Sequence, residues 1–217
     1  MTGSGRAAAV KPKSLLQAGW DAIGIPFRLV LFSQEWLPRF HWTTLEEERL
    51  RAVRPWIAGR LLDIGAGPNT LVNEYRNGVG VDVYDWGGGA LVVADTSQLP
   101  FRAQSFDTVT FLACLNHIPN REDVLREARR LSRPGGRLIV TMIDPILGGI
   151  GHKIWWYSED KVRGGMKPGE VGGLWTRDVV RICRLAGFKL RHHGRFVYGM
   201  NNLLVFDAVD EGIPQHG

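Results

Sequence analysis

The sequence of 217 residues is poor in cysteine and has no long apolar run. Cys114 and Cys183 are its only cysteines, which excludes a multi-cysteine zinc pattern and favours a reducing compartment. No apolar run reaches the ~18 residues that a membrane-spanning helix needs. The opening residues, MTGSGRAAAVKPKS, lack the apolar core of a signal peptide. These absences predict a cytoplasmic protein.

Charge is unevenly distributed around a net value of +5. Residues 61–120 hold two basic and six acidic residues, whereas residues 121–195 hold sixteen basic and eight acidic ones. A basic flank suits an anionic acceptor, a lipid headgroup or nucleic acid, and solvated helix faces explain it equally well. Charge therefore leaves the partner open.

Length and composition suit one α/β domain with an appendage. We expect a disordered lead at 1–14, a helical N-terminal cap at 15–56, a main domain at 57–208 and a tail at 209–217. Residues 144–175 are rich in glycine and have no period, so they predict an inserted loop or lid. The cap is rich in large rings: Trp20, Phe27, Phe32, Trp36, Phe40, Trp42 and Trp56. These rings either pack the cap on the domain or, with Arg28 and Arg39, make peripheral contact with a membrane surface.

From residue 61 onward apolar runs alternate with helical patterns, which is typical of a parallel sheet flanked by helices. Strands are predicted near 61–64, 79–83, 90–94, 106–112 and 137–143, and closing strands at 188–192 and 197–208. Helices are predicted at 121–131 and 176–186. Pro134-Gly135-Gly136 is expected to stop the first helix and turn the chain into the next strand.

The stretch LLDIGAGPN, residues 61–69, organises this pattern. A strand runs into Asp63, a turn comes next at Gly65-Ala66-Gly67, and the residues after it can open a helix. Such a turn lets a ligand lie against bare backbone. It also occurs where no ligand binds, so its meaning depends on the acidic residues downstream.

Three predicted strands in succession end on a carboxylate: Asp63, Asp82 in VGVDV and Asp95 in LVVAD. Ligands of open parallel sheets lie outside the carboxyl ends of the strands. A carboxylate after the second strand can accept from both ribose hydroxyls, and one after the third from an adenine amine, with Thr96 and Ser97 beside it. A single Asp would more simply cap a turn, but three in register predict a nucleoside site.

The chain here resembles the class I S-adenosylmethionine-dependent methyltransferases, in particular the type 11 subfamily. The matching pieces are LLDIGAGPN, VGVDV, ADTSQLPFRAQSFDTVTF, HIPNREDVLREARRLSRPGGRLIV and the AGF at 186–188. The resemblance implies a Rossmann-like, doubly wound, mostly parallel seven-stranded α/β sheet with an antiparallel last strand. It also implies that S-adenosyl-L-methionine binds at Asp63, Gly65, Ala66, Gly67, Asp82, Val83, Asp95, Thr96 and Leu115.

The sequence departs from the family in two places. Asn69 stands where the family has its third glycine, and asparagine tolerates left-handed backbone better than most residues. The connection from Val83 to Ala90 is too short for the family's crossover helix, so the adenine side is either open or rebuilt by Trp86. Both departures leave a catalytically inactive binding or scaffold protein as an alternative. A nicotinamide dehydrogenase fits less well, because its glycine turn would need glycine where Thr70 stands.

Methyl transfer needs no metal or covalent nucleophile, and the sequence indicates neither. A general base helps when the acceptor is a hydroxyl or an acidic carbon, and His117 is the candidate, with pocket lining or helix capping as the simpler interpretation. Asn116-His117-Ile118-Pro119 lacks the motif of base-amino methyltransferases, and Cys114 is interpreted as a core residue, so nucleic acid is disfavoured. The predicted acceptor is a small, lipid-linked or saccharide molecule; RNA is a weaker alternative.

Overall fold

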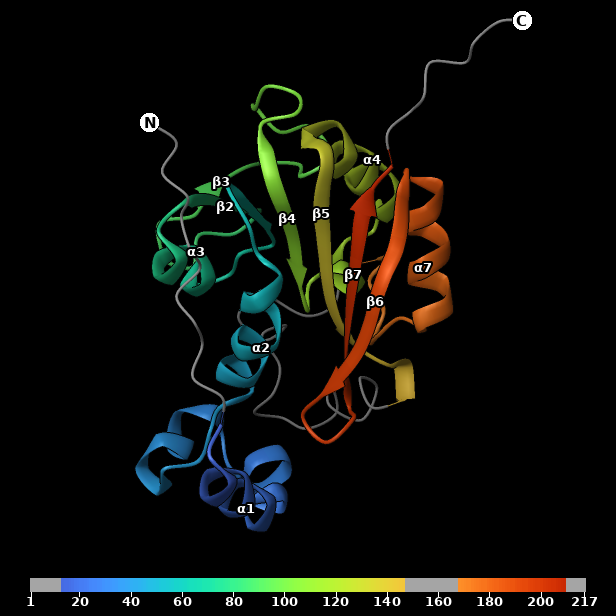
Figure 1. Cartoon of the computed structure of the whole chain (residues 1–217). Coiled ribbons are helices and arrows are strands. Elements are labelled where there is room, and N and C mark those ends of the chain that lie inside the picture. The colour runs from blue at the N-terminus through green and yellow to red at the C-terminus, as the bar shows by residue number, and fades with distance from the viewer. Residues whose placement is uncertain (1–12, 147–167, 210–217) are drawn as a thin grey trace, which may run out of the picture.

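The computed structural model describes residues 13–146 and 168–209. Its strands form one sheet of seven in the order β3-β2-β1-β4-β5-β7-β6 (Figure 1). All neighbours from β3 to β5 pair in parallel, and β7 runs antiparallel to both β5 and β6. The predicted Rossmann-like sheet is therefore confirmed. The strands are β1 (Leu61–Ile64), β2 (Gly78–Asp82), β3 (Leu91–Val92), β4 (Phe106–Leu112), β5 (Ser132–Ile143), β6 (Phe188–Phe196) and β7 (Asn201–Ala208).

Helices cover both faces of the sheet. α4 (Arg121–Leu131) and α7 (Thr176–Leu185) pack on one face, and α2 (Leu45–Val53) and α3 (Thr70–Tyr75) on the other. Leu61 contributes to the cluster under α2 and α3, whereas Leu62 and Ile64 contribute to the cluster under α4. Because successive strand residues point to opposite faces, β1 is buried on both sides, as a central parallel strand must be.

The segment Pro134-Gly135-Gly136 does not stop the helix before it, so that prediction is wrong. α4 already ends at Leu131, where Ser132 becomes extended and its hydroxyl donates to the Ala128 carbonyl at 2.7 Å. Residues 134–136 lie inside β5 instead. There the register against β4 jumps from Phe106↔Ser132 to Thr108↔Arg137, which makes this segment a bulge.

The N-terminal cap consists of α1 (Leu15–Ile23), a π-turn at Phe27–Leu31 and a 3₁₀ segment at Gln34–Phe40. Ser14 caps α1 by accepting from the backbone N–H of Gln17 at 3.1 Å. In Figure 1 the cap lies beyond the end to which β4 points, at the carboxyl edge of the parallel strands. Among the described helices none is long and apolar enough to cross a membrane. Residues 1–12, 147–167 and 210–217, which hold most of the expected lead, lid and tail, lie outside the described residues.

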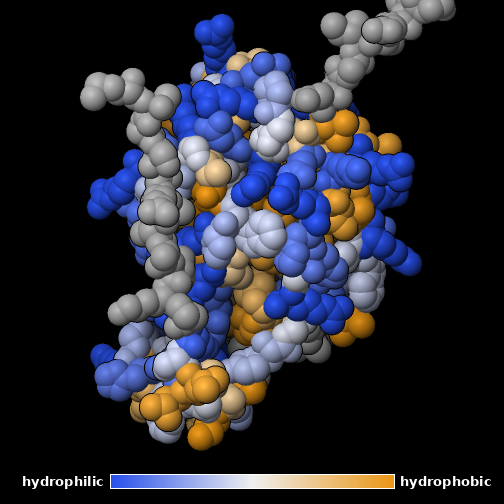
Figure 2. Space-filling model, in the orientation of Figure 1, coloured by the Kyte–Doolittle hydropathy of each residue, from blue (hydrophilic) through white to orange (hydrophobic). Residues whose placement is uncertain are grey.

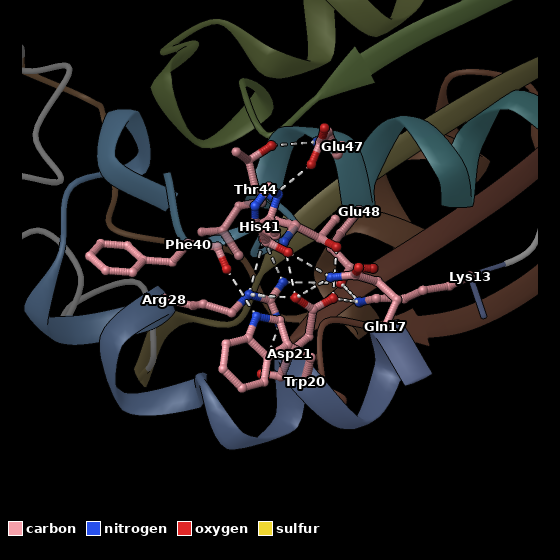
Figure 3. Close-up of polar contacts among 12 residues, drawn as sticks. Lys13, Gln17, Trp20, Asp21, Arg28, Phe40, His41, Thr44, Glu47 and Glu48 are labelled. Atoms are coloured by element: carbon pink, nitrogen blue, oxygen red, sulfur yellow. Dashed lines mark hydrogen bonds and ion pairs between the residues drawn. The ribbon is translucent and has the colours of Figure 1, made fainter. Parts of the chain in front are cut away.

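A buried arginine ties the cap together and joins it to the sheet (Figure 3). Arg28 has no exposed surface, and its guanidinium donates to the carbonyl of Thr43 from Nε at 3.0 Å and Nη2 at 2.7 Å. It also donates to Glu48 of α2 at 3.1 Å and to the hydroxyl of Tyr198, in the β6–β7 turn, at 2.8 Å. The carboxylate of Asp21 lies 3.8 Å from Nε. One cation therefore binds four other residues, from the cap, α2 and the β6–β7 turn.

The Asp21 carboxylate is fully buried and accepts from the Thr43 amide at 3.0 Å and the Thr43 hydroxyl at 2.7 Å. Burial acts to raise the pKa of Asp21, but hydrogen bonds from Lys13 and Thr43 outweigh it, and the pKa lies below its ordinary value. Both buried charges, those of Asp21 and Arg28, therefore have hydrogen-bond partners.

Arg28→Ala should lower the free energy of unfolding by about 3 kcal/mol, because it leaves the Asp21 carboxylate and the Thr43 carbonyl buried without their partner. Urea unfolding followed by tryptophan fluorescence measures this loss. Arg39→Ala is the matched control, because Arg39 is exposed and lies over the Trp36 ring at 4.3 Å, a contact worth about 0.5 kcal/mol. Equal losses in the two variants would contradict the role given to Arg28.

Candidate active site

The turn between β1 and α3 needs three positive φ angles: 72° at Gly65, 53° at Gly67 and 61° at Asn69. A Cβ at Gly65 would lie 2.7 Å from the Cys114 side chain, so both space and conformation require glycine there. A Cβ at Gly67 would meet no atom within 4 Å, so its backbone is open to a ligand. Asn69 adopts the left-handed conformation, and the turn persists without a third glycine.

Asp63 lies within β1 and is buried, with 2% of its surface exposed. Its carboxylate accepts from the Thr110 hydroxyl of β4 at 2.6 Å. Burial raises the pKa of Asp63 to about 7, and the charge of Asp82 adds to the rise, while the Thr110 hydrogen bond and the positive charge of Arg49 oppose it. Asp63 therefore faces β4, and the negative charge of Asp82 acts on it at this edge of the sheet.

Asp82, the last residue of β2, joins the turn after β1 to the loop after β2. One carboxylate oxygen accepts from the Gly67 amide at 2.8 Å and the other from the Tyr84 amide at 3.0 Å. Each carboxylate oxygen can accept a second hydrogen bond, so hydroxyl groups of a ligand can still be bound. The neighbouring side chain of Val83 is half-exposed.

The connection between β2 and β3 contains no helix, as the short spacing predicts. It folds back on the turn after β1: the Gly88 carbonyl accepts from the side chains of Asn69 at 3.3 Å and Asn73 at 3.1 Å. A Cβ at Gly88 would lie 1.9 Å from the Pro68 carbonyl oxygen, so only glycine permits this approach. The ring of Trp86 contacts that of Tyr84, with centroids 4.9 Å apart.

Asp95 lies three residues beyond the two-residue strand β3 and is exposed. Its carboxylate accepts from the Ser97 amide at 2.8 Å and the Ser97 hydroxyl at 2.6 Å, and these bonds hold the pKa of Asp95 below its ordinary value. Asn120, which precedes α4, also donates to it at 3.3 Å. Thr96 beside it is buried. The structure thus brings Asp82 into direct contact with the glycine turn, and the charge of Asp82 acts on Asp63. Asp95 contacts Ser97 and Asn120 instead.

Two surface hollows flank this region. One of about 490 Å³ is lined in part by Asp95, Ser97 and Asn120. The other, of about 500 Å³ between α4 and α7, contains none of the predicted site residues. The open backbone at Gly67, and not the size of a hollow, is therefore the feature that marks the candidate site.

The predicted segment Leu115–His117 forms a short 3₁₀ turn after β4, with Leu115 buried. Nδ1 of His117 lies 3.3 Å from Oε2 of Glu170, whose side chain is only 2% exposed. Asn116 exchanges two hydrogen bonds with the backbone of Val171, at 3.0 and 3.1 Å. Residues 169–171, part of the predicted loop, are therefore docked against the turn that carries His117.

Arg121 fastens these two segments. Its guanidinium donates to the carbonyls of Leu115 and Asn116 at 3.0 Å and of Gly169 at 2.8 Å. Burial lowers the pKa of Arg121, and the charge of Glu170 opposes that shift. Arginine can satisfy three carbonyls because its guanidinium offers five donors in one plane.

The thiol of Cys114 is not poised as a nucleophile. It donates to the Ile64 carbonyl at 3.0 Å, and burial together with the charges of Asp63 and Asp82 raises its pKa well above the ordinary value. The interpretation of Cys114 as a packing residue agrees with these contacts.

The sequence pattern did not indicate two residues of this region, Glu170 and Arg49. Glu170 lies 53 residues beyond His117 in a segment without a period, so no local pattern could pair them. Arg49 of α2 lies in the predicted cap, yet its positive charge acts on Asp63, and its buried Nε has no hydrogen-bond partner among the described residues. His152 and Tyr157, two further side chains that the sequence offers as a base, lie outside the described residues.

Comparisons with known proteins agree with this geometry. A family model described as "Methyltransferase domain", of type 11, matches residues 62–140. Two curated relatives are the ubiquinone/menaquinone biosynthesis C-methyltransferase of Ectopseudomonas mendocina (strain ymp) and the 27-O-demethylrifamycin SV methyltransferase of Amycolatopsis mediterranei (strain S699). The first is 33% identical over 113 residues, 42% of this chain and 43% of that enzyme. The second is 36% identical over 117 residues, 44% and 43% of the two chains. In both cases the chain spans well under half of the relative's length.

The fold matches solved structures over most of the chain. A methyltransferase of Thermotoga maritima, described as a possible histamine N-methyltransferase, aligns with a TM-score of 0.61 at 19% identity. The alignment covers 87% of this chain and 98% of that one. At this identity the likeness concerns the fold alone.

The sheet order and its antiparallel last strands are those of a Rossmann-like methyltransferase fold, in agreement with the solved structure. Within that fold, residues 62–140 match the type 11 methyltransferase domain, and the solved structure that the chain resembles is described as a methyltransferase dependent on S-adenosylmethionine.

Asp63→Asn should change the pH dependence of stability. The native carboxyl keeps its proton up to about pH 7, whereas the unfolded one loses it near its ordinary pKa of 3.8, so this group costs stability as the pH rises between those values. The variant should gain up to about 4 kcal/mol relative to the parent between pH 4 and pH 8, measured by urea unfolding. Asp95→Asn should act in the opposite direction. The lowered pKa of Asp95 means that its carboxylate stabilises the native state above pH 3.8, so the variant should be less stable than the parent there. Parallel pH profiles for the parent and Asp63→Asn would show that Asp63 is not protonated in the native state.

Proposed function

We propose that this chain is a methyltransferase that transfers the methyl group of S-adenosylmethionine to a small-molecule, lipid-linked or saccharide acceptor. The observation that carries the proposal is the Asp82 carboxylate bonded to the Gly67 amide beside open backbone. The curated relatives support the acceptor class, because their names assign them to ubiquinone/menaquinone biosynthesis and to a rifamycin. Since the chain spans less than half of them, the acceptor itself is part of the proposal.

In this proposal each cofactor residue has a distinct task. Asp82 accepts hydrogen bonds from the ribose hydroxyls, and Asp95, with Thr96 beside it, binds the adenine amine. Asp63 and Arg49 lie together at the end of the cofactor that carries both an ammonium and a carboxylate group. Arg49 is the residue with an unsatisfied buried donor there, so it suits the carboxylate. The bound cofactor supplies an activated methyl group on a sulfonium, and the protein orients the acceptor for in-line displacement.

His117 would accept the proton that the acceptor releases. With the Nδ1 proton directed at Glu170, the basic position of the ring is Nε2. The Glu170 carboxylate fixes that ring orientation and stabilises the imidazolium formed when Nε2 takes a proton. Glu170 is thus a positioning residue, and His117 keeps its simpler interpretation as pocket lining if the acceptor needs no base.

A binding or scaffold protein without catalysis is the second candidate. The sequence features that suggest it are Asn69 and the short connection at residues 83–90. The left-handed conformation of Asn69 counts against the first reason, because the backbone of the turn takes the positive φ that a glycine would adopt. RNA remains the weaker alternative acceptor.

Asp82→Ala should weaken S-adenosylmethionine binding at least about tenfold, because hydrogen bonds to a charged acceptor each contribute about 1.5–3 kcal/mol. Isothermal titration measures the affinity, and circular dichroism shows whether the fold is kept. Asp207→Asn is the control, because Asp207 pairs with Arg191 on β6 and lies at the opposite edge of the sheet. Affinity within twofold of the parent in Asp82→Ala would refute the ribose assignment. The absence of binding by the parent at millimolar cofactor would favour the scaffold candidate.

His117→Ala should slow methyl transfer about a hundredfold while the cofactor affinity stays within twofold of the parent. Glu170→Gln, which keeps the shape but loses the charge, should lower kcat about tenfold with little change in KM. Both are measured as labelled methyl incorporated into a small-molecule and lipid extract. Unchanged turnover in His117→Ala would make it a lining residue, and a loss confined to KM in Glu170→Gln would assign Glu170 to binding.

A further inference from the structure

The sheet does not fix the position of Asp95. Strand β3 contains only Leu91–Val92, and the next residue, Val93, donates to the Asp82 carbonyl at 2.9 Å. Asp95 lies two residues farther along the chain, and it is exposed. The orientation of its carboxylate therefore depends on other parts of the chain.

Helix α4 holds the loop that carries Asp95. The buried side chain of Glu127 accepts from the Leu99 amide at 2.9 Å. Arg130 pairs with Glu127 at 2.6 Å and donates to the carbonyls of Leu99 at 3.2 Å and Phe101 at 3.1 Å. The loop after β3 is therefore bonded to α4 by both its backbone donors and its backbone acceptors.

Asn120 lies at the N-cap of the same helix, but its side chain does not cap it. An asparagine at this position ordinarily accepts from a backbone amide of the first turn. Here no side-chain cap bond forms, and only the backbone carbonyl of Asn120 accepts, from the Asp123 and Val124 amides at 3.1 Å. The side-chain amide instead donates to Oδ1 of Asp95 at 3.3 Å. The residue that begins α4 is therefore bonded to the Asp95 carboxylate.

The hydrogen bonds of Asp95 leave its two oxygens unequal. A carboxylate offers about four acceptor positions, two on each oxygen. Oδ1 accepts from the Ser97 amide at 2.8 Å and from Asn120, so both of its positions are filled. Oδ2 accepts from the Ser97 hydroxyl at 2.6 Å, and its second position is open among the described residues. Asn120 therefore decides which oxygen can accept a hydrogen bond from a ligand.

We propose that Asn120 is a positioning residue, which holds the Asp95 carboxylate so that Oδ2 accepts from the amine of adenine. This role rests on the proposed function, in which Asp95 binds that amine. The amine can donate to the open position, whereas hypoxanthine has a carbonyl oxygen at the same place, which a carboxylate repels. Through Asp95, Asn120 then makes the site prefer an adenosyl compound to an inosyl one.

Isothermal titration of the full chain with S-adenosylhomocysteine and S-inosylhomocysteine measures this preference. The parent should bind the adenosyl compound at least about tenfold more tightly, because its amine donates to a charged acceptor. Asn120→Ser should reduce the ratio of the two affinities at least about threefold, since serine suits an N-cap but is too short to reach Asp95. Asn77→Ser is the control and should keep the ratio, because Asn77 donates to the Gly59 carbonyl at 2.9 Å, at the amino end of β2.

The contact also has a readout in the free protein. Hydrogen bonds from Ser97, with a smaller contribution from Asn120, hold the pKa of Asp95 below its ordinary value. Carbon-13 NMR titration of the Asp95 carboxyl should therefore give a higher pKa in Asn120→Ser than in the parent or in Asn77→Ser. The neutral substitution leaves unchanged the charged side chains that line the hollow beside Asp95: Asp123, Arg126, Glu127 and Arg130.

Either of two results in Asn120→Ser would overturn the proposal, provided that circular dichroism shows the parent's fold. One is an affinity ratio equal to that of the parent, and the other is an unchanged pKa of Asp95. Both leave the proposed function intact. Equal binding of the two compounds by the parent would remove adenine from Asp95, and the role of Asn120 with it. Failure of the parent to bind either compound would contradict the proposed function itself.

Discussion

The hydrogen bond between the Gly67 amide and the Asp82 carboxylate fixes how the turn after β1 meets the end of β2. It is reinforced by the Gly65 and Ala66 amides, which donate to the Val81 carbonyl at 2.9 and 3.0 Å. These bonds are possible only because Gly65 and Gly67 adopt positive φ, and because no side chain at Gly65 pushes Cys114 away. The open backbone at Gly67 and the left-handed Asn69 belong to the same turn.

A second polar centre, around Arg28, stabilises the cap, just as the glycine turn fixes the carboxyl edge of the sheet. A small helical segment rich in exposed apolar groups (Figure 2) has little core of its own, so apolar burial alone stabilises it weakly. Arg28 compensates by binding α2 and the β6–β7 turn at once. The cost is a fully buried charge, which is tolerable because its donors meet oxygens of Thr43, Glu48 and Tyr198.

The proposed site and the N-terminal cap share one end of the molecule (Figure 1). Both lie where the parallel strands end, which is where ligands of such sheets bind. α2 contributes Arg49 to the site, and Arg28 of the cap is bonded to Glu48 of the same helix, so the cap is joined to a helix that takes part in the site. Glu170 and Arg121 then close the opposite side of the edge by docking residues 169–171 on the turn that carries His117.

The sequence by itself determined the sheet, because apolar periodicity and glycine placement are local properties that survive without tertiary context. It also predicted the left-handed Asn69 and the missing crossover helix, since both depend on residue chemistry and chain length. Only the tertiary structure could decide that Asp63 is buried against Thr110, that Pro134–Gly136 forms a bulge, and that Arg28 is internal while Leu15 and Leu16 are exposed. Contacts such as His117 with Glu170 join residues 53 positions apart, and their geometry depends on the packing of elements that no local pattern encodes.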